Sequence, residues 1–190
     1  MNPDELLEFA QEVAHFVRAR GVRSVIVGGI ALAAHNVFRA TKDLDLGVAT
    51  PPANLALIAQ DLREGGFDVE LREPDGDDRL GGLIEVRREP LTVEVVNFDN
   101  SPAHGFPQAI EDGLAALPDD GLRAIPLTQL VALKIYASSL DAGGHRSRRD
   151  VWMLLQNNPH ADHAEIWDTC RKYRLPVDRF RDLMEAEARP

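Results

Sequence analysis

Residues 27–46 read VGGIALAAHNVFRATKDLDL, and this stretch decides the fold. The β-branched residues 25–27 are followed directly by Gly28 and Gly29. This pattern predicts a buried strand that ends in a tight turn. It ends on Asp43 and Asp45, which alternate with leucines as in a half-buried strand. The Ala- and Leu-rich residues between the two strands favour a short helix.

The two glycines are the first candidate ligand-binding feature. Glycines between a strand and a helix let backbone N–H groups approach a phosphate closely, and the helix N-terminus adds partial positive charge. The commoner meaning of Gly-Gly after a strand is a tight turn that binds nothing. Gly28 and Gly29 are therefore candidate phosphate-binding residues whose role depends on what lies beside them.

The two aspartates that follow the glycines are candidate ligands of a cation. Side chains two residues apart on a strand project from the same face, so Asp43 and Asp45 are expected side by side. Two adjacent carboxylates repel each other and need a cation or solvent to hold them together. Hard oxygen ligands of this kind suit Mg²⁺. The alternative is a solvated polar face on an edge strand.

A third carboxylate, Glu94, interrupts the apolar run at residues 93–96. Burying it among valines is costly unless something compensates the charge. If this strand pairs beside the strand that carries Asp43 and Asp45, the three side chains form a cluster able to bind two metal ions and assist displacement at phosphorus. The alternative is that Glu94 lies on the exposed face of an edge strand.

The remaining pattern predicts an α+β fold, in which a mixed, largely antiparallel sheet with flanking helices is followed by a helical C-terminal part. We expect an α/β core over residues 1–125 and a helical subdomain over residues 126–190. Strands are expected at 24–27, 43–48, 67–71, 83–86 and 91–96, and helices at 3–20, 30–37, 53–64, 127–140, 147–156, 161–174 and 177–188.

The segment from the glycines to the aspartates resembles the signature of the nucleotidyltransferase (polymerase β-like) superfamily. Its form, with Arg39 and Thr41 ahead of the Asp-Leu-Asp-Leu strand, looks most like the minimal bacterial branch that includes the AbiEii-type toxins. The run LVALKIYA at residues 130–137 and the run RSRRDV at 146–151 look like the lysine helix and the basic-Asp helix of those toxins.

The resemblance implies a role for each motif residue. Gly28 and Gly29 would cradle a triphosphate, and Asp43, Asp45 and Glu94 would bind Mg²⁺ or Mn²⁺ and carry catalysis. The nucleotide-binding set would be completed by Arg39, Thr41, Lys134 and Asp150. Lys134 would meet phosphate as a point charge. Asp150 would orient Lys134 or position the acceptor.

Several of these residues have plainer readings or depart from the family pattern. Arg39 either clamps a phosphate or pairs with nearby carboxylates, and Thr41 either binds nucleotide or only favours the strand. Gly29 stands where the family commonly has Ser, and Glu94 stands where Asp is more usual. Met153 stands where many toxin relatives carry a second Asp.

The sequence thus predicts a metal-dependent nucleotidyltransferase that moves a nucleoside monophosphate from an NTP to an acceptor hydroxyl. The toxin resemblance points to tRNA as acceptor and to an antitoxin protein as partner. The alternatives are an enzyme with a protein or small-molecule acceptor, and an inactive relative that senses nucleotide or binds a partner.

Composition sets the outer limits of these predictions. The 190 residues carry 31 acidic and 21 basic side chains, a net charge of −10 that argues against broad coating of nucleic acid. The dense basic cluster is His145, Arg146, Arg148 and Arg149, which is either a solvated helix start or a contact for an RNA backbone. No apolar run approaches the ~20 residues needed to span a bilayer, so we expect a cytoplasmic protein without a membrane partner.

Overall fold

The computed structural model describes residues 3–74, 80–100, 106–138 and 144–187. Two predicted helices extend beyond these ranges, at residues 139–140 and 188. Along the chain the elements are α1 (Pro3–Ala19), β1 (Val25–Val27), α2 (Gly28–Ala34), β2 (Asp43–Val48), α3 (Pro52–Glu64), β3 (Asp68–Arg72), β4 (Leu83–Arg88), β5 (Leu91–Asn97), α4 (Pro107–Ala115), α5 (Leu127–Ser138), α6 (His145–Asn157), α7 (His163–Lys172) and α8 (Val177–Glu187).

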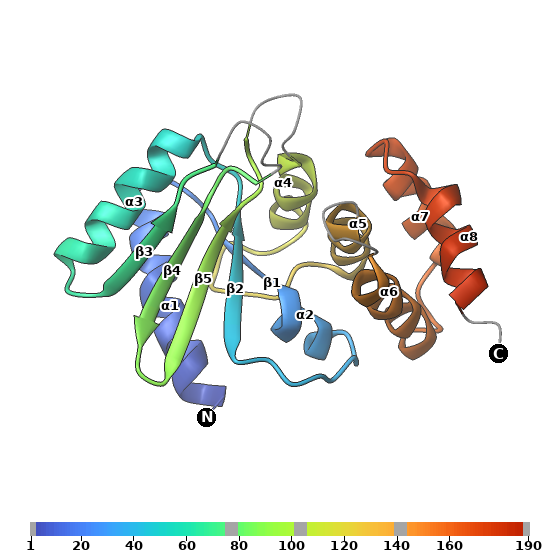
Figure 1. Cartoon of the computed structure of the whole chain (residues 1–190), viewed down its shortest axis with the longest axis horizontal. Coiled ribbons are helices and arrows are strands. Elements are labelled where there is room, and N and C mark those ends of the chain that lie inside the picture. The colour runs from blue at the N-terminus through green and yellow to red at the C-terminus, as the bar shows by residue number, and fades with distance from the viewer. Residues whose placement is uncertain (1–2, 75–79, 101–105, 139–143, 188–190) are drawn as a thin grey trace.

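The strands form one mixed sheet in the order β1-β2-β5-β4-β3 (Figure 1). Three of the neighbouring pairs are antiparallel, and β2 with β5 is parallel. The parallel pair places the strand of Glu94 directly beside the strand of the two aspartates, with Asp45 opposite Glu94. The α+β class and the mixed, largely antiparallel sheet are therefore confirmed.

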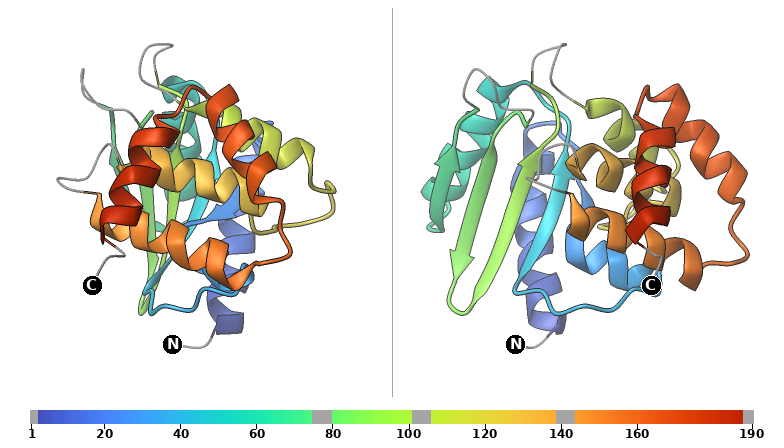
Figure 2. Two further views of the ribbon diagram at one scale, coloured as in Figure 1. Left: turned by 90° about the vertical axis from the view of Figure 1, so that its right-hand side faces the viewer. Right: turned by 45° about the vertical axis from the view of Figure 1, so that its right-hand side comes forward.

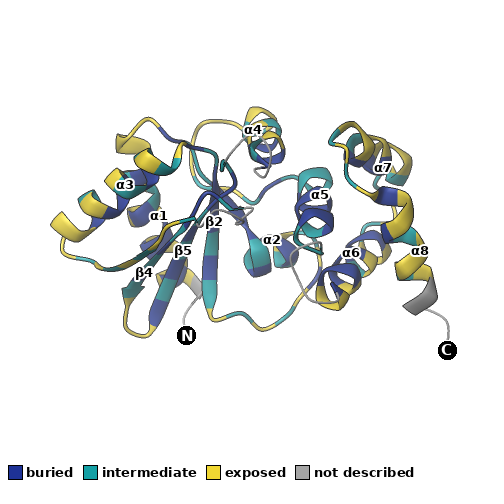
Figure 3. Ribbon diagram, turned by 45° about the horizontal axis from the view of Figure 1, so that its top comes forward, coloured by how far each residue is buried: buried dark blue, intermediate teal, exposed yellow. Residues whose placement is uncertain are grey.

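The sheet has one apolar and one polar face because apolar and polar residues alternate along its strands. Leu44, Leu46, Val93 and Val95 are buried on the face that packs against α1 and α3. Figure 3 shows this alternation as dark and teal residues along β2 and β5. The opposite face carries the carboxylates of Asp43, Asp45 and Glu94. Packing of the apolar face therefore fixes the strands on which these carboxylates lie.

The C-terminal helices gather beside β1 and β2, away from β3 (Figure 2). Helix α5 packs against α4, α6 and α7, and a bridge between Ile26 and Ala124 ties the preceding segment to β1. The predicted division at residues 125 and 126 falls just before α5 and stays a prediction. Among the helices in the described ranges, none has the length and apolarity to cross a membrane.

Two local features differ from the sequence-based expectation. The two glycines lie inside the first turn of α2, not in a turn ahead of it, because Val27 is the N-cap and Gly28 turns the chain with a φ of 62°. Helix α4 was not predicted. Its Gly113 weakens the helical pattern, yet a Cβ there would lie 2.9 Å from Ile125, so close packing requires the glycine.

Candidate active site

The carboxylates form a row across the polar face of the sheet. Asp43 and Asp45 lie on β2, Glu94 is paired with Asp45 on β5, and Glu85 is paired with Glu94 on β4. Glu85 was not singled out from the sequence, although the alternation of LIEVRR on β4 places it on this face. The sheet thus assembles carboxylates from three neighbouring strands.

Electrostatic interactions link these carboxylates. Burial, followed by repulsion from Asp43, raises the pKa of Asp45, and a hydrogen bond from the Gly29 backbone N–H partly offsets this rise. Burial, followed by repulsion from Asp45, Asp43 and Glu85, raises the pKa of Glu94 to about 7. Like charges in one partly buried patch favour binding of a proton or a cation.

The glycines lie against this patch. An ideal Cβ on Gly28 would lie 1.6 Å from Oδ2 of Asp45, so no other residue fits without moving that carboxylate. A Cβ on Gly29 would lie 2.9 Å from both Cβ and Oγ1 of Thr41. The Thr41 hydroxyl in turn donates a 2.5 Å hydrogen bond to Oδ1 of Asp43. The glycine pair therefore packs directly against Asp45, and it contacts Asp43 through the Thr41 side chain.

A buried ion cluster lies across from the carboxylates. Asp150 on α6 is 4% exposed, and its Oδ2 lies 2.8 Å from Nζ of Lys134 on α5. The same oxygen lies 3.2 Å from Nη1 of Arg39, which belongs to the connection between α2 and β2. Arg39 thus pairs with a carboxylate, one of its two expected roles, and the same carboxylate also pairs with Lys134.

The connection that carries Arg39 runs from α2 to the start of β2, and we call residues 35–42 the lip segment (Figure 1). It is fastened to the C-terminal end of α6, where the Asn157 amide donates to the Asn36 carbonyl at 2.7 Å and the Asn158 amide donates to the His35 carbonyl at 2.8 Å. These contacts hold the lip segment at the edge of the site.

A cavity of about 240 Å³ lies between the carboxylates and the ion cluster. Its polar lining comes from Gly28, Arg39, Asp45 and Lys134, and its apolar lining includes Phe98. Within the described part of the chain, Nε of Arg39 is the buried side-chain nitrogen or oxygen that lacks a hydrogen-bond partner. Arg39 also lines the cavity, and a guanidinium beside a cavity is suited to an anionic ligand.

The basic cluster is only partly at the surface. His145, Arg146 and Arg149 are exposed on the first turns of α6, whereas Arg148 is 6% exposed and its guanidinium lies 3.0 Å from the ring Nδ1 of His145. The prediction that Arg148 could meet an RNA backbone is therefore wrong. Helical periodicity explains the difference, since Arg148 lies on the side of α6 that faces the core.

The predicted three-carboxylate metal centre is not preassembled. In the described ranges, no group of three or more His, Cys, Asp and Glu side chains is gathered closely enough to hold a metal ion. Asp43, Asp45 and Glu94 nevertheless share one sheet face and repel one another, and carboxylate oxygens are ligands that Mg²⁺ accepts. The donor set fits a divalent cation.

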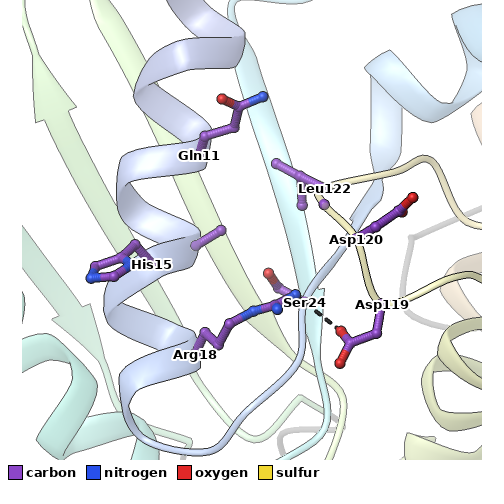
Figure 4. A pocket seen from close by; sticks show the side chains of 9 residues that line it. Gln11, His15, Arg18, Ser24, Asp119, Asp120 and Leu122 are labelled. Carbon is purple, nitrogen blue, oxygen red and sulfur yellow. Dashed lines mark hydrogen bonds and ion pairs between the residues drawn. The ribbon is translucent and has the colours of Figure 1, made fainter.

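A larger hollow, of about 540 Å³, lies elsewhere on the molecule, between α1 and residues 119–122 (Figure 4). Its lining includes His15 and Asp120, and Arg18 crosses it to form a 3.1 Å ion pair with Asp119. None of the predicted site residues lines this hollow, so size alone does not mark the active site.

Comparison with known proteins agrees with this geometry. The family described as "Nucleotidyl transferase AbiEii toxin, Type IV TA system" matches residues 19–189. The chain belongs to the AbiEii family. It is therefore a nucleotidyltransferase, and the expected superfamily is confirmed. No curated protein sequence matches the chain significantly.

Solved structures show the same fold at low sequence identity. ANT(2″)-Ia in complex with adenylyl-2″-tobramycin is 13% identical, with a TM-score of 0.56 over 88% of this chain and 96% of that one. A nucleotidyltransferase-like protein from Paracoccidioides brasiliensis is 18% identical, with a TM-score of 0.52 over 98% and 93% of the two chains. The Megavirus polyadenylate synthase is 16% identical, with a TM-score of 0.50 over 82% of this chain and 32% of that one.

The raised pKa of Glu94 predicts a pH dependence of stability in metal-free AbiEii protein. Because the folded state holds this proton more tightly than the unfolded state, the free energy of unfolding should fall as pH rises from about 4.5 through about 7. Denaturant titrations in EDTA between pH 5 and 8 measure it. Glu94→Gln should lose this part of the dependence and be more stable than wild type at pH 8. Glu89→Gln, in the exposed turn after β4, is the control, and an identical slope in wild type and Glu94→Gln contradicts the prediction.

Proposed function

We propose that this AbiEii protein transfers a nucleoside monophosphate from an NTP to an acceptor hydroxyl in a reaction that requires Mg²⁺ or Mn²⁺. One observation carries the proposal. One cavity is lined both by Asp45 and Gly28 and by the cations of Lys134 and Arg39, which act electrostatically on Asp45. A triphosphate with a divalent cation matches this arrangement, since the cation faces carboxylates and the phosphates face an ammonium, a guanidinium and backbone N–H groups.

Each residue then has a role that its chemistry allows. Asp43, Asp45 and Glu94 hold the cation, and Gly28 and Gly29 bring the backbone against the phosphates. Lys134 and Arg39 contact the terminal phosphates, and Asp150 orients both of these cations. The bound cation aligns the triphosphate and lowers the cost of ionising the acceptor hydroxyl.

The chemistry is an in-line displacement at the α-phosphorus. The acceptor oxygen forms a bond to that phosphorus, the bond to the bridging oxygen of the β-phosphate breaks, and pyrophosphate leaves. The hydroxyl proton is lost to a base. Glu94 is our candidate for that base, because its carboxylate lies on the same sheet face as the two aspartates.

For the acceptor we propose the 3′ end of a tRNA. Exposed cations lie on the two segments that carry Asp150 and Arg39, with Arg146 and Arg149 on α6 and Lys42 on the lip segment. Phe38 on the same segment is 80% exposed, and an exposed aromatic ring can stack on an unpaired base. Blocking the 3′ hydroxyl of tRNA would stop its aminoacylation. This acceptor would account for action as a toxin, with an antitoxin protein as its natural partner.

A second acceptor class is favoured by the charge of the sheet. Glu94, Glu85 and Glu70 are consecutive partners across β5, β4 and β3, and this acidic row suits a hydroxyl-bearing polycation. The fold is also shared by ANT(2″)-Ia, whose structure holds an adenylylated tobramycin. Arg72 and Arg87, however, form ion pairs with Glu70 and Glu85, and these pairs reduce the negative charge of the row.

The metal requirement can be tested by calorimetry of NTP binding. We expect wild-type protein to bind NTP more weakly in EDTA than in Mg²⁺, because without the cation the carboxylates repel the phosphates. In Asp43→Asn and Asp45→Asn that difference should disappear while the melting temperature stays near wild type. Asp68→Asn, an exposed position on β3, is the matched control. Equal NTP binding by wild type with and without metal refutes the metal site.

The role of Lys134 can be tested by comparing ligands. Lys134→Met keeps most of the aliphatic stem and removes the charge. It should weaken triphosphate binding more than monophosphate binding, because a point charge paired with Asp150 acts mainly on the terminal phosphates. Equal losses for the two ligands would assign Lys134 a packing role instead.

The acceptor can be identified by labelling with α-³²P NTPs in the presence of total RNA, cell lysate protein or an aminoglycoside. We expect the label on tRNA, declining with rising salt and falling by roughly tenfold in Arg146→Ala/Arg149→Ala. Lys172→Ala/Arg179→Ala removes the same charge from exposed positions on α7 and α8 and should leave labelling unchanged. Label on the aminoglycoside alone would select the polycation, and label on protein alone would refute both.

A further inference from the structure

Gly29 and Thr41 share one small space beside the aspartates. The ideal Cβ of residue 29 would lie 2.9 Å from both Oγ1 and Cβ of Thr41, closer than real Cβ contacts allow. The Thr41 side chain therefore occupies the place that a side chain at position 29 would need. Only glycine at position 29 lets the threonine stand where it does.

The threonine hydroxyl is directed at the first aspartate. It donates a 2.5 Å hydrogen bond to Oδ1 of Asp43, and the carbonyl oxygen of Asp43 lies 3.2 Å from the same hydroxyl. Thr41 is only partly exposed, and exposure alternates along this part of the lip segment, with Phe38, Ala40 and Lys42 outward. The Thr41 side chain is thus turned inward, and its hydroxyl is held on Asp43.

We propose that Thr41 is a positioning residue for the cation, and that Gly29 is present to admit its hydroxyl. By holding one oxygen of Asp43 before any ligand arrives, the hydroxyl removes side-chain freedom that cation binding would otherwise have to freeze. The proposal rests on the proposed function, because it assumes that Asp43 binds a divalent cation. It adds that the hydroxyl itself, and not the bulk of the threonine, sets the affinity.

Moving the hydroxyl from position 41 to position 29 distinguishes a role of the hydroxyl from a role of side-chain packing. Gly29→Ser/Thr41→Ala carries a hydroxyl into the same space from the other side, whereas Gly29→Ala/Thr41→Ala fills similar volume without one. We expect Thr41→Val to bind Mn²⁺ about tenfold more weakly than wild type, and Thr41→Ser to bind it within about twofold of wild type. Gly29→Ser/Thr41→Ala should recover part of the lost affinity, and Gly29→Ala/Thr41→Ala should not.

The measurement is the Mn²⁺ dissociation constant, followed by electron paramagnetic resonance of free Mn²⁺, with melting temperatures to confirm folding. Wild-type affinity in Thr41→Val, or equal recovery in the two double variants, overturns the proposal. Should Thr41→Val fail to fold, the Ser variant and the two double variants still decide it.

A second readout keeps this inference separate from the proposed function. Crystal structures of metal-free wild type and Thr41→Val should show the Asp43 carboxylate in one conformation in the first and displaced or split in the second. Wild-type protein that binds no Mn²⁺ would remove the metal from the proposed function. An unchanged Asp43 conformation in Thr41→Val would overturn the positioning role whether or not metal binds.

Discussion

The backbone of Gly28 packs directly against the carboxylate of Asp45, and the site depends on this contact. A Cβ at position 28 would lie 1.6 Å from that carboxylate, and Gly28 also adopts a φ of 62° that disfavours other residues. The contact follows from the sheet, because Val27 is paired with Asp45 in the register of β1 and β2. The N–H of Gly29 then donates to the same carboxylate. The register of β1 and β2, the backbone at the two glycines and the position of the Asp45 carboxylate therefore depend on one another.

A second constraint joins the helical part of the chain to the sheet. Asp150 on α6 is buried and holds both Lys134 on α5 and Arg39 on the lip segment. A buried carboxylate is tolerated only when its charge is compensated, so these three residues depend on one another. The helices that follow the sheet therefore supply one side of the cavity and fix the position of its cations.

The sequence was informative where a pattern repeats on a short scale. Alternation along the strands predicted that Asp43 and Asp45 share a face. For Glu94 the sequence left two alternatives, a place beside the aspartates or the exposed face of an edge strand, and the pairing of β5 with β2 gives the first. The link between Lys134 and Asp150 came from family resemblance, because helical spacing alone does not pair two helices.

The missed features are those that depend on tertiary packing. Helix α4 contains Gly113, which is needed because a larger residue would clash with Ile125. Glycine is a poor helix former, so the sequence pattern did not indicate a helix there. Arg148 is buried because α6 turns that side toward the core, which a list of basic residues does not reveal. Glu85 enters the site only through its pairing with Glu94 on the neighbouring strand.

The most direct test of the central claim compares the two ends of the nucleotide. Protein incubated with Mg²⁺, total RNA and NTP labelled either at the α- or at the γ-phosphorus should attach only the α-label, with one pyrophosphate released for each label transferred. Asp45→Asn should attach neither. Transfer of the γ-label, or α-label transfer that persists in Asp45→Asn, would contradict the assignment of this cleft as the site of nucleotidyl transfer.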